Sequence, residues 1–244
     1  MNNYKIVLEY AGENYHGFAK QPGLDTIQGI VEENLNKILK EEIYTLGAGR
    51  TDAKVHALNQ VINFETNSNI MPEALLKALN SNLPRDIVAK SVNIVDNSFH
   101  ARYSAKAKKY MYVINNNEIP SAFNMDREYF CKYKLDVEKI KKAAVYFIGK
   151  HDFAAFVNVG GVITDTIREI YSVEVKEENQ IIKIIFNGEG FLYNQVRIMV
   201  GTLIEVGRGI KKVEDIQKII ESKDRKNAGA TSKPEGLYLL DVEY

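Results

Sequence analysis

The sequence predicts an α+β protein made of two successive halves, each with a largely antiparallel sheet flanked by helices. The chain has 244 residues, of which 45% are hydrophobic, and this is enough to build one large core or two small ones. Strand and helix periodicities follow one another along the chain, and hairpin-like spacings occur where parallel sheets would need long crossovers. The predicted halves are residues 1–105 and 106–244. A central basic cleft between them is the expected place for a site.

The first half is predicted to run strand, helix, strand, helix, strand. Residues 4–10 alternate in polarity with Ile6 and Leu8 on the buried side, as in a strand with one solvated face. Residues 26–39 carry apolar side chains at helical spacing, and the helix at 72–79 opens on a proline. The remaining apolar runs, residues 55–64 and 87–95, are typical of strands.

The second half begins with an extended segment at residues 110–114, followed by a helix at 137–148. Two strands, 170–175 and 181–186, are predicted to form a hairpin across a polar turn. A long apolar helix at 192–206, a further helix at 213–221 and a closing strand at 237–242 complete the predicted elements.

Composition excludes several classes of protein. The single cysteine, Cys131, cannot form an intramolecular disulfide, and the first residues show no signal-peptide pattern. No window holds the roughly 18 uncharged apolar residues of a membrane-spanning helix. We therefore expect a soluble, cytoplasmic protein without a membrane partner.

Charge is balanced overall but not locally. The chain has 32 basic and 32 acidic residues, yet residues 97–117 contain four basic residues and no acidic one. Such a stretch is typical of a surface that binds phosphates. It is also typical of a solvated strand edge protected by lysines, and the charge pattern alone favours this second interpretation. The four residues are Arg102, Lys106, Lys108 and Lys109.

Common cofactor and metal motifs are missing from the sequence. The segment Gly47-Ala48-Gly49 begins like a dinucleotide loop, but Asp52 stands where its third glycine would fall. There is also no phosphate-binding GxxxxGK[ST] motif and no GxSxG elbow. The four histidines are far apart, without ligands at metal-binding spacing. The sequence therefore predicts neither a metal nor a cofactor.

The loop between residues 47 and 57 is the most informative segment. Arg50 and Asp52 are two residues apart, so in an extended backbone their side chains lie on the same side and can pair. An arginine beside a carboxylate keeps it ionised, which suits a nucleophile or a base rather than a general acid. The residues alone favour a simpler interpretation, a surface ion pair on a glycine turn, because no second carboxylate is nearby.

The segment Gly49-Arg50-Thr51-Asp52, leading into Val55-His56-Ala57, resembles the signature loop of the TruA family of tRNA pseudouridine synthases. Further segments resemble blocks of that family in the same order. They are Tyr15-His16-Gly17-Phe18 with Thr26-Ile27-Gln28, Phe99-His100-Ala101-Arg102-Tyr103-Ser104-Ala105, Lys109-Tyr110-Met111-Tyr112, His151-Asp152-Phe153 with Ala155-Phe156, Gly190-Phe191-Leu192-Tyr193-Asn194-Gln195-Val196-Arg197, and Pro234-Glu235-Gly236-Leu237-Tyr238-Leu239. Together they extend over the whole chain.

The resemblance implies an enzyme that isomerises uridine to pseudouridine in the anticodon stem-loop of tRNA, at positions 38, 39 and 40, without cofactor or metal. It implies that Asp52 is the catalytic aspartate, acting either as a nucleophile on the nucleoside or as a base on the ribose. Arg50 is implied to pair with Asp52 and to help hold a flipped nucleotide. Arg197 is implied to join the aspartate from the second half of the cleft, although alone it resembles a charge on a helix surface.

Binding residues follow from the same resemblance. Tyr110 matches a tyrosine that stacks on the uracil, whereas the residues alone also fit an ordinary core tyrosine in a strand. The basic stretch then supplies phosphate contacts, through Arg102, Lys106, Lys108 and Lys109. The family fold is a homodimer, and the apolar helix predicted at 192–206 is in keeping with one.

The sequence departs from the family pattern at several positions. Lys54 stands where family members usually carry glycine, and a glycine there could serve a positive φ. Lys108 replaces a more usual arginine, and Ala230, Ser232 and Lys233 replace a motif richer in proline and alanine.

Two alternatives to a synthase are a catalytically altered RNA-binding paralogue and a nucleoside hydrolase, but no partner acid for the hydrolase is evident.

Overall fold

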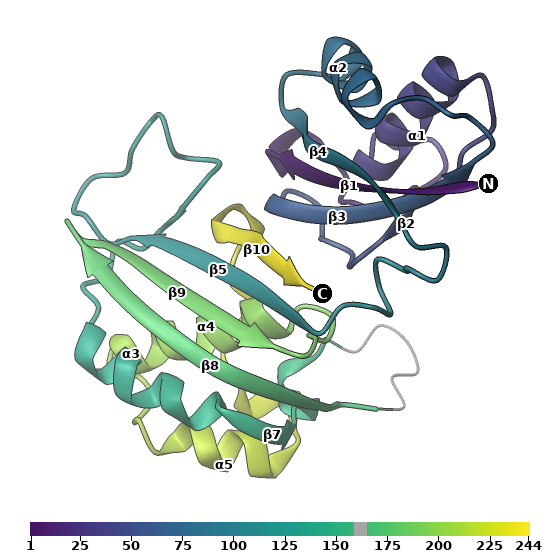
Figure 1. The fold of residues 1–244 in the computed structure, drawn as a ribbon. Coiled ribbons are helices and arrows are strands. Elements are labelled where there is room, and N and C mark those ends of the chain that lie inside the picture. Colours follow the sequence, from purple (N-terminus) through teal and green to yellow (C-terminus); the bar gives the residue numbers. More distant parts are fainter. Residues whose placement is uncertain (159–164) are drawn as a thin grey trace. The chain divides into compact units, whose positions relative to one another are not determined.

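The computed structural model describes residues 1–158 and 165–244, which form two compact α+β units (Figure 1). The first unit contains residues 1–106 together with 238–244, and the second contains residues 107–237. The chain thus leaves the first unit, builds the second, and returns to the first for its last strand.

The sheet of the first unit has the strand order β4 (Ile87–Val95), β1 (Asn2–Tyr10), β3 (His56–Thr66) and β10 (Leu237–Glu243). The short β2 (Leu46–Gly47) also pairs with β3. β1 is antiparallel to both of its neighbours, and β10 runs parallel to β3. Tyr4, Ile6 and Leu8 are fully buried at alternate positions of β1, because one face of the strand packs on the core.

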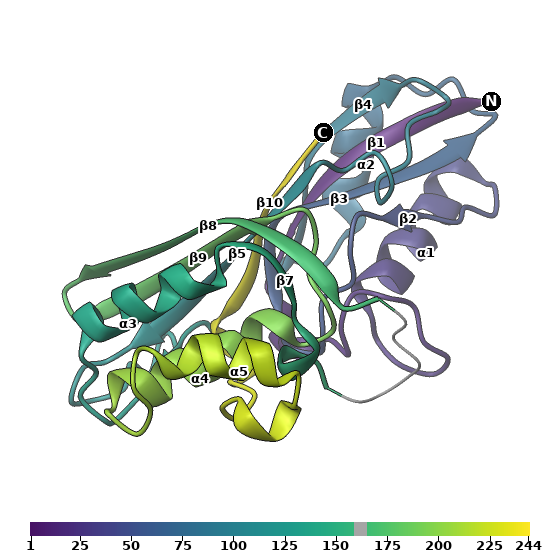
Figure 2. The same ribbon diagram turned by 90° about the horizontal axis from the view of Figure 1, so that it is seen from below.

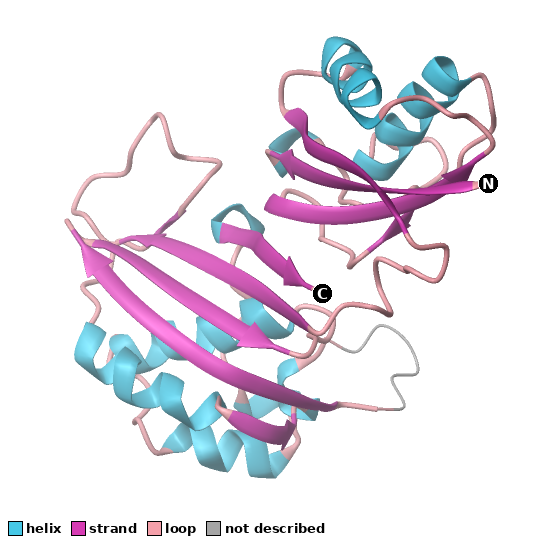
Figure 3. Cartoon of the chain, viewed as in Figure 1, coloured by secondary structure: helices cyan, strands magenta, loops and turns pink. Residues whose placement is uncertain are grey.

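Two helices in contact with one another, α1 (Ile27–Leu39) and α2 (Pro72–Asn82), cover one face of this sheet (Figure 3). Thr26 caps α1, since its hydroxyl accepts a hydrogen bond from the backbone N–H of Gly29 at 3.3 Å. The helix buries Ile27, Val31 and Leu35, which lie four residues apart and therefore on one face. α2 begins with proline at its first turn, where no intrahelical N–H is needed.

The sheet of the second unit has the order β5 (Ala107–Asn115), β9 (Ile181–Gly188), β8 (Ile167–Glu178) and β7 (Gly149–Asp152), and these pairings are antiparallel. The short β6 (Tyr129–Phe130) runs parallel to β5. β9 alternates in burial, with Ile182, Ile184 and Phe186 facing the core. That core face is the one the helices cover.

Helices α3 (Val137–Ala144), α4 (Gln195–Gly207) and α5 (Asp215–Ser222) lie on the same side of this sheet (Figure 2). α4 is buried along almost its whole length, as expected for a helix between the sheet and its neighbours. α5 is amphipathic and buries only Ile216, Ile219 and Ile220. Within the described ranges, no helix has the length and apolar character that crossing a membrane requires.

The predicted α+β class with largely antiparallel sheets is confirmed, and the differences are local. The helix predicted at 137–148 ends at Ala144 and continues as a 3₁₀ turn, Val145–Phe147. The helix predicted from 192 begins at Gln195, because Asn194 adopts a left-handed conformation with φ of 60°. The strand predicted at 237–242 is present but pairs within the first unit, so the second half predicted as 106–244 does not keep its last residues.

Candidate active site

Asp52 opens a tight turn immediately before β3. The backbone N–H of Val55 donates to the carbonyl oxygen of Asp52 at 3.1 Å, which closes the four residues 52–55. Lys54 occupies the third position of the turn with a φ of +66°, the left-handed region that a type II turn requires there. The backbone at this position therefore has the conformation that glycine would adopt without strain, and a lysine is held in it.

Residues preceding α1 hold this loop in place. The hydroxyls of Thr51 and Tyr10 lie 2.8 Å apart and share a hydrogen bond, and burial raises the pKa of Tyr10 so that its proton is retained. The carbonyl oxygen of Thr51 accepts from the N–H of Phe18 at 3.0 Å. On the other side of Asp52, the N–H of Lys54 donates to the carbonyl oxygen of Tyr15 at 3.3 Å. The backbone is thus tied on both sides of the aspartate.

Two glycines allow this close approach. A Cβ on Gly17 would lie 2.7 Å from the carbonyl oxygen of Thr51, and Gly17 has a φ of +96°. A Cβ on Gly12 would lie 2.0 Å from the carbonyl oxygen of Val55. Any side chain at either position would therefore displace the loop that carries Asp52.

The same segment is anchored to the start of α1. The carbonyl oxygens of Gly17 and Phe18 accept hydrogen bonds from the N–H groups of Ile27 and Gln28, at 3.1 and 2.9 Å. These donors belong to the first turn of the helix, which has no intrahelical acceptors for them. The position of Asp52 is therefore coupled to a regular element of the fold rather than to a free loop.

Arg50 and Asp52 differ in their surroundings. Asp52 is half-buried, whereas Arg50 is exposed. β3 begins at His56, directly after the turn at residues 52–55, and Arg50 and Thr51 precede that turn.

Tyr110 and Arg197 lie in the second unit. Tyr110 is buried on β5, and its ring lies edge-on to that of Phe191, with centroids 5.2 Å apart. Arg197 lies on α4, where its Nε donates to the carbonyl oxygen of Ser232 and its Nη1 to Asn194 Oδ1, both at 2.8 Å. The Ser232 hydroxyl in turn donates to the carbonyl oxygen of Arg197 at 2.8 Å. The orientation of the guanidinium is thus fixed by both flanking segments.

The four basic residues do not form a single row. Arg102 and Lys106 are exposed residues of the first unit, and Lys108 and Lys109 are half-buried on β5 of the second. Adjacent residues of a strand point to opposite faces, so Lys108 lies on the Tyr110 face of β5 and Lys109 on the other. One flat RNA surface could therefore contact only one of these two lysines.

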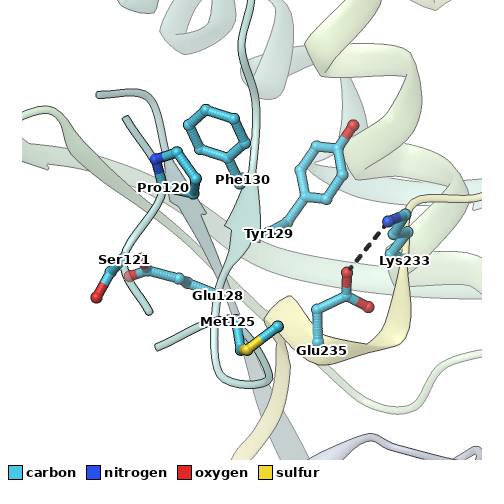
Figure 4. Close-up of a pocket in the computed structure, with 8 residues that line it drawn as sticks. All are labelled: Pro120, Ser121, Met125, Glu128, Tyr129, Phe130, Lys233 and Glu235. Atoms are coloured by element: carbon cyan, nitrogen blue, oxygen red, sulfur yellow. Dashed lines mark ion pairs between the residues drawn. The ribbon is translucent and has the colours of Figure 1, made fainter. Parts of the chain in front are cut away.

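A small pocket of about 160 Å³ lies elsewhere in the second unit (Figure 4). Pro120, Met125, Tyr129 and Phe130 give it an apolar wall, and the Lys233 ammonium points toward the Glu235 carboxylate at 3.8 Å. None of the predicted site residues lines it. Among residues 1–158 and 165–244, no group of three or more histidine, cysteine or acidic side chains is placed to hold a metal ion.

Sequence reasoning did not assign a role to the residues that support the loop. Tyr15, Gly17 and Phe18 were part of a matching block, and Tyr10 was only a strand residue in the sequence. The available signal was Gly17 itself, since a glycine between two aromatic residues marks close backbone contact. The loop that it contacts is 34 residues further along the chain, and periodicity cannot show that.

Comparison with known proteins identifies the class. A family model described as tRNA pseudouridine synthase matches residues 6–104 and 143–244, which include the Asp52 loop and Arg197. The chain belongs to the tRNA pseudouridine synthase family, whose members are isomerases that form pseudouridine in tRNA.

The similar curated proteins carry a more specific name. The chain is 48% identical over 244 residues to tRNA pseudouridine synthase A of Acetivibrio thermocellus and to tRNA pseudouridine synthase A 2 of Clostridium perfringens, with full coverage of both. It is 44% identical to tRNA pseudouridine synthase A of Lacticaseibacillus casei, again over the full length of both chains. A solved chain from a Cbf5-Nop10-Gar1 complex is similar at 14% identity and a TM-score of 0.39, over 96% of this chain and 57% of that one, which is too low to support a functional argument.

Proposed function

We propose that this synthase modifies uridines in the anticodon stem-loop of tRNA, at positions 38, 39 and 40, and that Asp52 is its catalytic residue. The observation that carries the proposal is the loop at residues 51–55, which is tied on both sides of the half-buried Asp52 in a chain of the tRNA pseudouridine synthase family. Catalysis gains from a group that is already held in its reactive position, since no ordering is then needed during the reaction.

The reaction is an isomerisation and needs no other reactant. The bond between N1 of uracil and C1′ of ribose breaks, the base turns, and a new bond forms between C5 and C1′. The proton on C5 is lost to solvent and N1 gains one, so atoms and charge balance. Asp52 would act either by attacking the nucleoside or by removing a ribose proton, and an ionised carboxylate serves in both cases.

The other predicted site residues receive roles in the same proposal. Arg197, whose guanidinium is oriented by Ser232 and Asn194, would stabilise the aspartate or the departing base. Tyr110 would stack on the uracil, supported edge-on by Phe191. Arg50, which is exposed two residues before Asp52, would pair with the aspartate and help hold the nucleotide that leaves the stem.

The test is tritium release from unmodified tRNA labelled at uridine C5, comparing the parent with Asp52→Asn. The amide keeps the size of the side chain but can neither attack nor accept a proton at neutral pH, so we expect tritium release to fall to background. Binding of tRNA should persist, because phosphate contacts and stacking are unchanged. Asp25→Asn is the matched control, since Asp25 is an exposed aspartate of the same unit outside the loop.

The outcomes separate the alternatives. Turnover of a folded Asp52→Asn variant within about tenfold of the parent, roughly 1.4 kcal/mol of barrier, would remove Asp52 from the mechanism. Binding of tRNA by the parent without tritium release would indicate a catalytically altered RNA-binding paralogue. Free uracil would indicate a hydrolase. Mapping the pseudouridines by chemical labelling would show whether they lie at positions 38, 39 and 40.

We propose in addition that the protein forms a homodimer. The helix at residues 192–206 does not support this, because α4 is buried inside its own unit. The support comes instead from exposed apolar side chains in the loop before β6, where Ile119 is 78%, Phe123 95% and Met125 67% exposed. Light scattering at micromolar concentration should give twice the 27.7 kDa of one chain, and Phe123→Ser should shift the mass toward the monomer. A monomer mass for the parent would contradict the proposal.

A further inference from the structure

A tight turn at residues 100–104 presents an aromatic ring to solvent. The N–H of Ser104 donates to the carbonyl oxygen of His100 at 2.9 Å, and the Ser104 hydroxyl accepts from the N–H of His100 at 3.1 Å. Tyr103 lies within this turn and is 76% exposed. The ring is therefore accessible to an external partner.

The turn is firmly attached to the first unit. The N–H of Ala101 donates to Asn63 Oδ1 on β3 at 2.8 Å, and the hydroxyl of Tyr244 donates to the carbonyl oxygen of Ala101 at 2.7 Å. Burial raises the pKa of Tyr244, so the donor stays protonated. Asn3 Nδ2 also donates to the carbonyl oxygen of Phe99 at 3.0 Å. The exposed ring is therefore carried on an ordered support, which lowers the entropy cost of binding.

An arginine and a histidine flank the ring of Tyr103. The Arg102 guanidinium lies 5.6 Å from the ring centroid, and the His100 ring lies 4.4 Å away at an angle of 43°. His100 Nδ1 accepts hydrogen bonds from the N–H groups of Arg102 and Tyr103, at 3.1 and 3.3 Å, so the orientation of the imidazole is fixed. An aromatic face next to a guanidinium is a combination that binds a nucleotide by stacking and charge.

Two other exposed tyrosines, Tyr44 and Tyr171, lie beside carboxylates, whereas Tyr133, which is 47% exposed, has the Arg208 guanidinium 3.7 Å from its ring centroid. The hydroxyl of Tyr44 donates to Glu42 Oε1 at 2.5 Å, and this carboxylate raises the pKa of Tyr44. Burial and the carboxylates of Glu189 and Glu169 raise the pKa of Tyr171. A polyanion is repelled at these two positions but attracted beside Arg102. Electrostatics therefore favour Tyr103 over Tyr44 and Tyr171, and Tyr103 is more exposed than Tyr133, at 76% against 47%.

We propose that Tyr103 binds tRNA by stacking on an unpaired base, while Arg102 contacts an adjacent phosphate. The proposal rests on the proposed function, because it needs tRNA as the substrate, and it adds a base-binding position outside the Asp52 loop. Stacking on an aromatic side chain is tolerant of base identity, so Tyr103 contributes affinity and orientation rather than sequence choice.

The first experiment uses the absence of tryptophan from the sequence. In Tyr103→Trp the new indole is the only tryptophan, so its fluorescence reports on that position alone. We expect quenching when unmodified tRNA is added, since a stacked base quenches an indole. Tyr44→Trp is the matched control, because Tyr44 is an exposed tyrosine of the same unit beside a carboxylate, and its fluorescence should not change. Equal responses of the two variants, or no response of Tyr103→Trp while tRNA binds, would overturn the proposal.

The second experiment measures affinity by filter binding. Tyr103→Ala should weaken tRNA binding by roughly 5- to 150-fold, the range expected for loss of one base stack, whereas Tyr103→Phe should bind like the parent. Unchanged binding by Tyr103→Ala would overturn the proposal. Tritium release by the parent distinguishes failure of the Tyr103 proposal from failure of the proposed function. If the parent releases tritium, unchanged binding by Tyr103→Ala contradicts only the role of Tyr103. If the parent releases none, the proposed function itself is wrong.

Discussion

Lys54→Gly should stabilise the protein while leaving its catalysis unchanged. Lys54 is held at a φ of +66° in the turn that Asp52 opens. The conformation is unfavourable for any residue with a Cβ, and glycine adopts it freely. The turn itself depends on backbone hydrogen bonds, including the one between the Val55 N–H and the Asp52 carbonyl, and these remain in the variant.

The expected magnitude is the difference between two effects. The left-handed conformation costs an L-residue about 1–2 kcal/mol, and glycine avoids this cost. Glycine loses more backbone freedom on folding, which offsets about 0.5–1 kcal/mol of the gain. We therefore expect a net stabilisation of about 0.5–1 kcal/mol, which for a chain of this size raises the melting temperature by about 1–4 °C.

The assay is denaturant and thermal unfolding of the parent, Lys54→Gly and Lys54→Ala. Alanine removes the same ammonium but retains a Cβ, so its stability should stay within about 0.5 kcal/mol of the parent. The reasoning is refuted if the glycine variant is no more stable than the alanine variant. Tritium release by Lys54→Gly should remain within about threefold of the parent, and a loss to background would show that the lysine itself takes part in the reaction.

Three further outcomes are expected. Gly17→Ala should cost about 2 kcal/mol of stability and lower turnover, because its Cβ would lie 2.7 Å from the Thr51 carbonyl oxygen at a φ of +96°. Gly190→Ala is the control: a Cβ at Gly190 meets open space, so this variant should unfold like the parent. A hydrogen bond from Thr166 and the Lys223 ammonium lower the pKa of Asp152. The stabilising effect of Asp152 is therefore present above about pH 4 and is lost as the pH falls through the lowered pKa. Asp152→Asn should lose less stability than the parent in acid unfolding over that range, and an identical acid profile would contradict this. Neutralising Lys106, Lys108 and Lys109 together should reduce the slope of log K against log[salt] for tRNA binding by about 1.8, which corresponds to two phosphate contacts. Two contacts are expected rather than three because Lys108 and Lys109 point to opposite faces of β5. An unchanged slope would mean that the basic stretch is only a solvated strand edge.

Local pattern was enough to predict most of the elements. A strand or helix with one face on the core has apolar residues at a regular spacing. Residues 4–10 alternate in this way, Ile27, Val31 and Leu35 lie four residues apart, and the structure buries these apolar side chains. The boundaries that differed depend on contacts that a pattern does not contain. Gln195 Oε1 accepts from the N–H of Leu192 at 2.8 Å, and this closes a separate turn where a helix was expected to begin.

The candidate site was less predictable than the fold. Asp52 was identified by resemblance, and the positive φ suspected at Lys54 is confirmed. The support of the Asp52 turn was not predictable, because it comes from backbone hydrogen bonds to Tyr15 and Phe18. Residues distant in sequence fix that turn, and propensity rules describe only neighbours.

The return of the chain to the first unit places a condition on biosynthesis. β10 pairs with β3 at His56 and Ala57, the first two residues after the Asp52 turn, and the N–H of Lys106 donates to the carbonyl oxygen of Glu243 at 2.8 Å. During translation, residues 238–244 leave the ribosome after the whole of the second unit has been made. His56 and Ala57 therefore lack this partner strand until the whole of the second unit has been made, and a nascent chain stalled before residue 238 would expose this part of the edge of β3 to wrong partners.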